Sequence, residues 1–225
     1  MNTSYSSFVH RSGEGLRLLT LLSVMSLLML AARCLLTRDA FFLLLSWNLF
    51  LAWIPLWTAN GIRKGLIRGT LPEWSLLPGL ALWLLFLPNA PYIITDLFHV
   101  RHVSEHTLFF DTMMIFLFAL TGLLTGLYSQ LQVHRLLRER LGRGPAWGVM
   151  LAVIVLTSFG IYLGRYGRWN SWDLVTNPVE LLKAVGTSLQ NSVAWKLTLS
   201  YTFALIVLYV GFTEYVQRQT HESLD

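Results

Sequence analysis

The most constraining feature of this 225-residue chain is a series of long apolar segments that carry almost no charge. Six segments fit this description, and we place them at residues 16–36, 41–57, 76–94, 108–127, 147–166 and 194–212. A helix of about 20 apolar residues crosses the hydrocarbon core of a bilayer. Backbone in lipid must satisfy its hydrogen bonds internally, which predicts helices. The sequence therefore predicts an all-α, polytopic transmembrane bundle that forms one domain over residues 1–225.

The charge of the chain fits a membrane protein better than a nucleic-acid-binding one. Only 13% of the residues are charged, where about 25% is usual in soluble domains. The net charge of +5 comes from basic residues in the connections, as expected for contact with anionic headgroups. The single cysteine, Cys34, excludes an internal disulfide and a cysteine-rich metal site. We expect the bilayer as the main partner and no nucleic acid; no cofactor is indicated.

The basic residues also predict an orientation. Connections 58–75 and 128–146 hold seven lysines and arginines, against three at 33–40 and 95–107. Short loops rich in lysine and arginine stay in the cytoplasm. We therefore predict both termini in the cytoplasm. Residues 16–36 lack a small-residue cleavage site and are interpreted as an uncleaved first span.

The third span is interrupted near its outer end by the sequence FLPNAPYIITDLFHVRH, residues 86–102. Pro88 and Pro91 each remove a backbone donor and disturb the helix. Unwound backbone at membrane depth is tolerated where it lines a wet cavity or is buried in protein. Asp96 and His99 follow, three residues apart. The pattern predicts a proline-broken span that helps to build a polar pocket.

Two further patterns concern packing and the surface. Small residues recur at a spacing of four in residues 122–126 and 160–164, which predicts close helix–helix contacts. In the long 167–193 connection, Asn177-Pro178 followed by Glu180 is typical of a helix start. Apolar residues at 181, 182, 185 and 189 then fall on one face. We predict an amphipathic helix on the outer membrane surface.

With the spans oriented, five segments bring unusual polar residues to the outer leaflet. Asp96 and His99 are the candidate catalytic residues. The candidate binding residues are Asn48, Asn89, Tyr92, Asp111, Arg165, Arg168, Asn170, Trp172 and Asp173. We expect Asp96 or Asp111 to pair with Arg165 or Arg168, with Asp96 nearer water. The alternative is a purely structural ion pair beneath an interfacial aromatic belt.

A metal site is a competing interpretation of the same region. Asp96, His99, His102 and His106 are spaced by three, three and four residues, which would align them on a helix. Residues 99–106 are, however, predicted to form a loop. Histidines are also common at membrane surfaces. We therefore assign no metal ligands from the sequence.

Several blocks of sequence resemble a known family. These are Trp47-Asn48-Leu49, the PNAPY run at 88–92 with Thr95-Asp96-Leu97 and His99, and the GRYGRWNSWD run at 164–173. They resemble the bacterial membrane proteins grouped as domain of unknown function 1361, from about Ser46 to Pro178. The resemblance implies a polytopic membrane protein in the inner membrane of a bacterium and brings no activity. His102 and His106 are not part of the motif, and Tyr166-Gly167 departs from it.

Three functional hypotheses follow. The first is an envelope-facing enzyme or binder for a lipid or lipid-linked substrate. In that case Asp96 is a general base, His99 an acid or base, and Arg165 or Arg168 holds a phosphate or carboxylate. The second is a small transporter with its site at the broken span. An apolar cytoplasmic half in every span argues against it. The third is a non-catalytic subunit or assembly factor that docks a partner protein.

Overall fold

The computed structural model describes residues 3–103 and 105–221, with side chains over 15–101, at 103 and over 105–219. Within these residues the chain is helical and contains no strand. Six helical segments are long and apolar enough to cross a membrane: Gly15–Thr37, Phe41–Ile67, Glu73–Arg101, Leu108–Leu141, Arg143–Gly167 and Ser192–Gln219. The predicted helical membrane bundle is thereby confirmed.

The elements follow one another with short connections. In chain order they are α1 (Thr3–Thr37), η1 (Phe41–Leu43), α2 (Leu44–Ile67), η2 (Glu73–Ser75), α3 (Leu76–Phe86), α4 (Asn89–Tyr92), η3 (Ile93–His102), α5 (Leu108–Leu141), α6 (Arg143–Gly167), α7 (Asp173–Thr176), α8 (Pro178–Leu189) and α9 (Ser192–His221). The η elements are tighter 3₁₀ helices.

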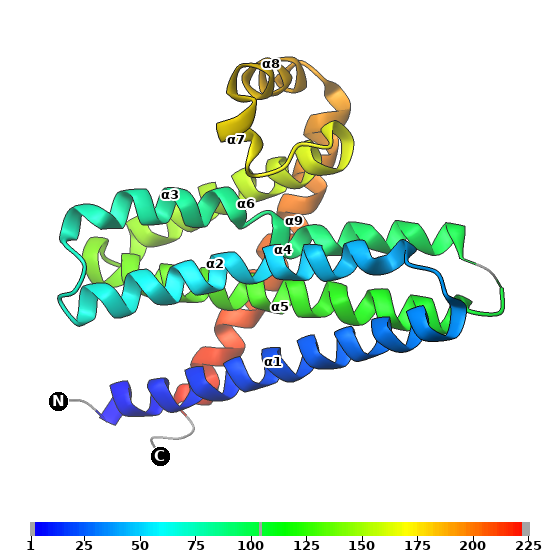
Figure 1. The fold of residues 1–225 in the computed structure, drawn as a ribbon. Coiled ribbons are helices and arrows are strands. Elements are labelled where there is room, and N and C mark those ends of the chain that lie inside the picture. The colour runs from blue at the N-terminus through cyan, green and yellow to red at the C-terminus, as the bar shows by residue number, and fades with distance from the viewer. Residues whose placement is uncertain (1–2, 104, 222–225) are drawn as a thin grey trace.

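The long helices run up and down between two ends of the bundle (Figure 1). Both chain termini lie at one end, here called the terminal end, with the turn between α2 and η2. The α1–η1 and η3–α5 connections lie at the opposite, distal end. Helix α5 contacts α1, α2, α4, η3 and α6, so it is the centre of the bundle. Helices α6 and α9 pack on each other and cross the others.

Several spans are longer than predicted, among them the second and the fourth. Helix α2 continues to Ile67 and α5 to Leu141, so most of the predicted 58–75 and 128–146 connections is helical. Polar residues that follow position 127 therefore lie inside the bundle. Gln130 and His134 are each only 3% exposed, and His134 Nδ1 lies 2.7 Å from the Tyr209 hydroxyl. The expectation of an apolar cytoplasmic half in every span is wrong for α5.

At its prolines, the third span shifts its helix axis and then continues as a tighter type of helix. Helix α3 ends at Phe86, α4 forms a single turn, and η3 continues as a 3₁₀ helix. Leu87, Pro88 and Ile93 all keep right-handed helical dihedral angles. The amides of Ala90 and Tyr92 bond to Leu87 and Pro88 carbonyls, at 3.1 and 3.0 Å. The predicted break is therefore a change of helix type and axis, because neighbouring amides still find local acceptors.

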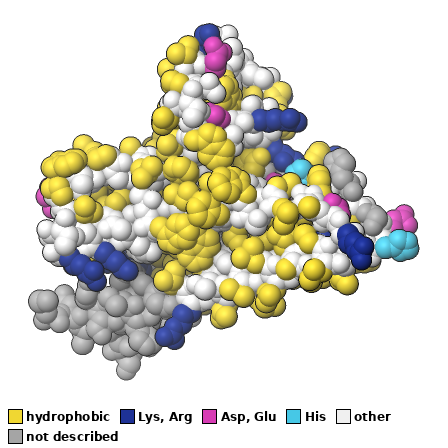
Figure 2. Space-filling model, in the orientation of Figure 1, with side chains coloured by type: hydrophobic (Ala, Val, Ile, Leu, Met, Phe, Trp, Pro, Cys, Tyr) yellow, Lys and Arg dark blue, Asp and Glu magenta, His cyan; other side chains and the backbone are white. Residues whose placement is uncertain are grey.

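The helix predicted at Asn177-Pro178 is present as α8, which with α7 stands apart from the long helices in Figure 1. The predicted apolar residues lie on one side of this helix but are buried to different extents. Leu181 and Val185 are partly buried, whereas Leu182 and Leu189 are 67% and 49% exposed. Figure 2 shows hydrophobic side chains over most of the visible middle of the bundle, as a bilayer requires.

Candidate functional site

The site is built around α4. Helices α5 and α6 pack closely against this segment at glycine residues. A Cβ at Gly122 on α5 would lie 2.6 Å from the Ala90 carbonyl oxygen. A Cβ at Gly160 on α6 would lie 2.6 Å from Pro88 Cγ. Only glycine permits so close an approach, as in small-residue contacts between membrane helices. The predicted packing role of these two glycine pairs is confirmed at these positions, and α4 is held between α5 and α6.

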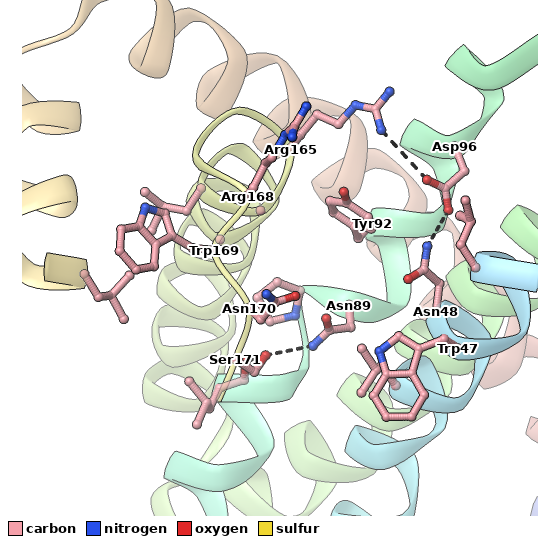
Figure 3. A pocket seen from close by; sticks show the side chains of 18 of the residues that line it. Trp47, Asn48, Asn89, Tyr92, Asp96, Arg165, Arg168, Trp169, Asn170 and Ser171 are labelled. Atoms are coloured by element: carbon pink, nitrogen blue, oxygen red, sulfur yellow. Dashed lines mark hydrogen bonds and ion pairs between the residues drawn. The ribbon is translucent and has the colours of Figure 1, made fainter. Parts of the chain in front are cut away.

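Asn89 ties this segment to the connection after α6. Its Nδ2 donates to the Phe86 carbonyl and to Ser171 Oγ, both at 2.9 Å (Figure 3). Ser171 Oγ donates in turn to the Leu85 carbonyl at 2.9 Å. These bonds occupy two backbone carbonyls in the last turn of α3. The loop at 168–172 is thereby fixed against the end of α3.

Asp96 lies on η3 and faces three other polar side chains. Asn48 Nδ2 on α2 donates to Asp96 Oδ2 at 2.7 Å. The other oxygen, Oδ1, lies 3.8 Å from His99 Nε2 and 3.9 Å from an Arg165 guanidinium nitrogen. A 3₁₀ helix places residues three apart on one face, which explains the Asp96–His99 proximity. Asp96 is 1% exposed and Asp111 is 0% exposed, so the two carboxylates are almost equally buried, and the expectation that Asp96 lies nearer water stays a prediction.

Arg165 lies beside the carboxylate, and Arg168 lines the same cavity. The Arg165 guanidinium lies 5.4 Å from the Phe98 ring centre, within the range of a cation–π contact. Arg168 is exposed, and no ion pair or hydrogen bond joins its side chain to the described residues. Its φ of 55° is left-handed, which is unfavourable for a side chain other than glycine. This conformation ends α6 and turns the chain back toward α3.

These groups enclose a cavity of about 840 Å³ near the distal end. Figure 3 shows its polar side chains converging from α2, η3, α6 and the loop after α6. Its polar and aromatic lining comprises Trp47, Asn48, Asn89, Tyr92, Asp96, Phe98, His99, Arg165, Arg168, Trp169, Asn170 and Ser171. Leucines from α2, α3, α6 and α8 complete the wall. The arrangement offers a carboxylate, an imidazole and two guanidinium groups to one ligand.

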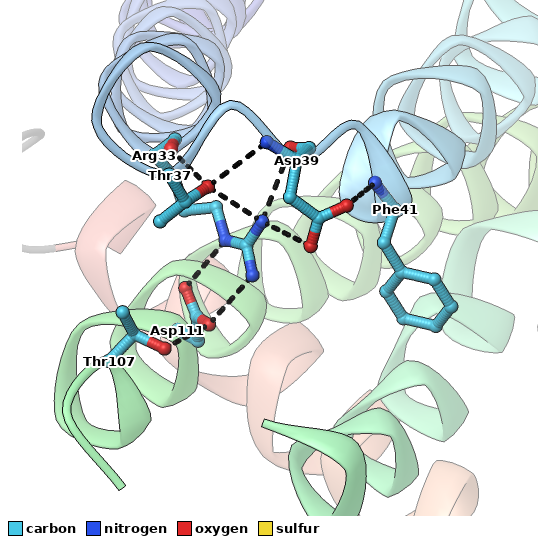
Figure 4. Close-up of polar contacts among 6 residues, drawn as sticks. All are labelled: Arg33, Thr37, Asp39, Phe41, Thr107 and Asp111. Atoms are coloured by element: carbon cyan, nitrogen blue, oxygen red, sulfur yellow. Dashed lines mark hydrogen bonds and ion pairs between the residues drawn. The ribbon is translucent and has the colours of Figure 1, made fainter. Parts of the chain in front are cut away.

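Asp111 is the main error among the predicted site residues. It is 0% exposed but lies outside the cavity, and its partner is Arg33 of α1 (Figure 4). Arg33 reaches both Asp111 oxygens at 3.3 and 3.4 Å, and Thr107 donates to the same carboxylate at 3.0 Å. Arg33 also donates to Asp39 at 2.8 Å. The expected pairing of Asp111 with Arg165 or Arg168 is wrong, whereas the Asp96–Arg165 proximity is present.

Trp172 and Asp173 do not line the cavity either. Trp172 stacks edge-on against Trp47 with ring centres 6.2 Å apart. Asp173 accepts from the Asn170 amide at 2.7 Å and so shapes the loop. The structure instead adds Trp47, Phe98, Trp169, Ser171 and Leu181 to the lining. Three of these lie inside the WNL and RWNSWD blocks. Leu181 was predicted only as part of the apolar face of the surface helix, and no pattern in the sequence pointed to Phe98.

The metal interpretation gains no support from the described side chains. Among them, no three histidine, cysteine, aspartate or glutamate residues lie close enough to share a metal ion. His106 is exposed in the η3–α5 connection and does not line the cavity. The side chain of His102, the other candidate ligand, lies outside the described residues.

Comparison with known proteins gives one result. A family model described as a protein of unknown function, DUF1361, matches residues 47–208. The chain belongs to the DUF1361 family. The DUF1361 match includes every cavity-lining residue except Leu44, and it excludes Arg33. No curated protein and no solved structure matches the chain.

Proposed function

We propose that this DUF1361 protein binds the anionic head group of a lipid or lipid-linked molecule in the cavity and acts on it there. In this proposal Arg165 and Arg168 hold a phosphate or carboxylate through charged hydrogen bonds. Asp96 serves as general base, and His99 exchanges a proton with the ligand. The protein is a multi-pass membrane protein; its place in a bacterial inner membrane, with the cavity facing outward, is part of the proposal.

The observation that carries the proposal is the state of the Asp96 carboxylate. It is buried, yet one of its oxygens has its imidazole and guanidinium neighbours at 3.8 and 3.9 Å respectively, beyond hydrogen-bond distance. Taking a carboxylate out of water is costly unless it is paired, so such a group usually has a task. The adjoining cavity has room for the ligand that would complete its contacts.

Binding can be tested by extracting lipids that copurify with the protein and identifying them by mass spectrometry. We expect an anionic lipid that is retained by the wild type and lost from Arg165→Gln. His99→Gln should abolish turnover of that lipid, while His106→Gln, which changes an exposed histidine outside the cavity, should not. Retention of the same lipids by Arg165→Gln would contradict the proposal.

Orientation needs a separate measurement. Reporter fusions at residues 66 and 140 should report the cytoplasm, and fusions at 102 and 172 the outside. Residues 66 and 140 lie near the ends of α2 and α5, at the terminal end of the bundle. A reversed pattern would leave the cavity intact but place its ligand in the cytoplasmic leaflet.

A carrier is the second candidate, because α5 buries polar groups in the half of the bundle away from the cavity. The Gln130 side-chain oxygen and His134 Nε2 are buried without a hydrogen-bond partner among the described residues. Such atoms are rare in folded proteins and suggest contact with water or a passing solute. Uptake into proteoliposomes that depends on both Asp96 and His134 would favour a carrier over an enzyme.

A further inference from the structure

An aromatic ladder runs down the exposed face of α2 from the mouth of the cavity. Trp47, which lines the cavity, stacks on Phe50 with ring centres 5.5 Å apart. Phe50 in turn meets Trp57 edge-on at 5.8 Å. The three side chains are 53%, 50% and 47% exposed for Trp47, Trp57 and Phe50 respectively. Figure 2 shows a connected hydrophobic patch extending from the α7–α8 segment across the middle of the bundle.

This ladder differs from an ordinary interfacial belt. Tryptophan gathers at the two membrane–water interfaces, where its ring and its N–H group are both accommodated. Trp57 lies ten residues after Trp47, which is about 15 Å further along the helix at 1.5 Å per residue. The rings therefore follow the depth of the membrane rather than its surface. They form one continuous track that begins at a cationic cavity.

We propose that the ladder binds the single hydrocarbon chain of a polyprenyl phosphate whose phosphate occupies the cavity beside Arg165. This inference rests on the proposed function, since it supplies the tail of the ligand whose head group that function requires. One track of rings suits one chain, and the flat faces of the rings make dispersion contacts with successive unsaturated units. A diacyl lipid would need a second track beside the first.

The test compares ligands that share a phosphate but differ in their chains. Geranylgeranyl phosphate, geranyl phosphate and dioleoyl phosphatidic acid are titrated into the detergent-solubilised protein and followed by native mass spectrometry. We expect geranylgeranyl phosphate to bind most tightly. The double variant Phe50→Leu with Trp57→Leu should weaken it about tenfold, at the usual strength of two aromatic contacts, and affect geranyl phosphate much less.

Phe203→Leu is the matched control, because Phe203 is 72% exposed on α9 and lies off the ladder. It should leave all three affinities unchanged. Phe50→Leu alone gives a smaller loss and provides a second test if the double variant is unstable. Unchanged binding in both ladder variants, or equal binding of phosphatidic acid, would overturn the tail assignment. If Arg165→Gln weakens neither prenyl phosphate, the head-group site itself fails, and this outcome is distinguishable from loss of the ladder alone.

Discussion

Asp96 and Asp111 are two buried carboxylates near the same end of the bundle, and their surroundings differ sharply. Asp111 is 0% exposed and has both oxygens within reach of one guanidinium, with a threonine hydroxyl as a further donor. Asp96 is 1% exposed and has one firm donor, Asn48, while its other neighbours lie beyond hydrogen-bond distance beside a large cavity. The two carboxylates are therefore about equally buried. What distinguishes them is that the hydrogen bonds of Asp111 are complete, as in a structural ion pair, whereas those of Asp96 are not, as in a candidate functional residue.

The largest effect is expected at the Asp111 cluster. Arg33→Met leaves a buried carboxylate without its cation, which should lower the free energy of unfolding by roughly 3–5 kcal/mol. Combining Arg33→Met with Asp111→Asn should cost less than the sum of the two single changes, because the two residues interact. Melting of the four proteins in detergent measures this coupling. Arg165→Met is the control and should show additivity with Asp111→Asn.

The comparison also requires that α4, which precedes Asp96 in the chain, is rigidly packed. Otherwise the long distances from Asp96 to His99 and Arg165 would only reflect loose packing. Gly122→Ala tests this, because the new Cβ would meet the Ala90 carbonyl oxygen at 2.6 Å. Overpacking of this kind should destabilise the protein by about 1–3 kcal/mol. Gly211→Ala on α9 meets no atom within 4 Å and should be neutral or slightly stabilising. Equal melting temperatures for the two variants would show that α4 is not clamped.

A smaller change in stability is expected at the cavity itself. Asp96→Asn keeps the size of the side chain and an acceptor for Asn48, and it removes a charge with no cation at hydrogen-bond distance. We expect less than about 1 kcal/mol change in unfolding free energy, as for an isostere that leaves its partner satisfied. Ligand binding or turnover should nevertheless be lost. If Asp96→Asn melts as Asp111→Asn does and function survives, the Asp96 cluster is architectural and the enzyme hypothesis falls.

The same comparison shows what the sequence could and could not predict. Local patterns predicted the six spans, the disturbance at Pro88 and Pro91, the glycine contacts and the start of α8. Each depends on residues close together in the chain. The depth of a residue along its span was also predictable. The sequence therefore placed Asn48, Asp96 and Arg165 at a similar depth in the membrane.

The position of a residue around the bundle was not predictable in this way. Arg33 and Asp111 are 78 residues apart, and Arg33 was interpreted as part of a basic connection. Asp111 has the right depth for the cavity but faces α1, so a depth argument alone assigned it the wrong arginine. The extension of α5 was missed because arginines near 135–143 were taken to mark a loop.

The smallest change in stability is expected at Asp39, the second carboxylate that Arg33 contacts besides Asp111. Asp39 lies outside the spans and is half exposed, and its hydrogen bond from Arg33, with a further one from the Phe41 amide, lowers the pKa of Asp39 below its ordinary value of 3.8. A carboxylate with a lowered pKa contributes stability above its ordinary pKa, and that contribution is lost as the pH falls through the folded value. Asp39→Asn should therefore change the melting temperature only slightly at neutral pH, and it should flatten the acid-side decline between about pH 5 and pH 3. Parallel melts of the wild type and Asp39→Asn over this range measure the difference. If Asp39→Asn lowered the melting temperature as much as Asp111→Asn does, the exposed carboxylate would be as important to Arg33 as the buried one. The contrast drawn between the Asp111 and Asp96 clusters would then be wrong.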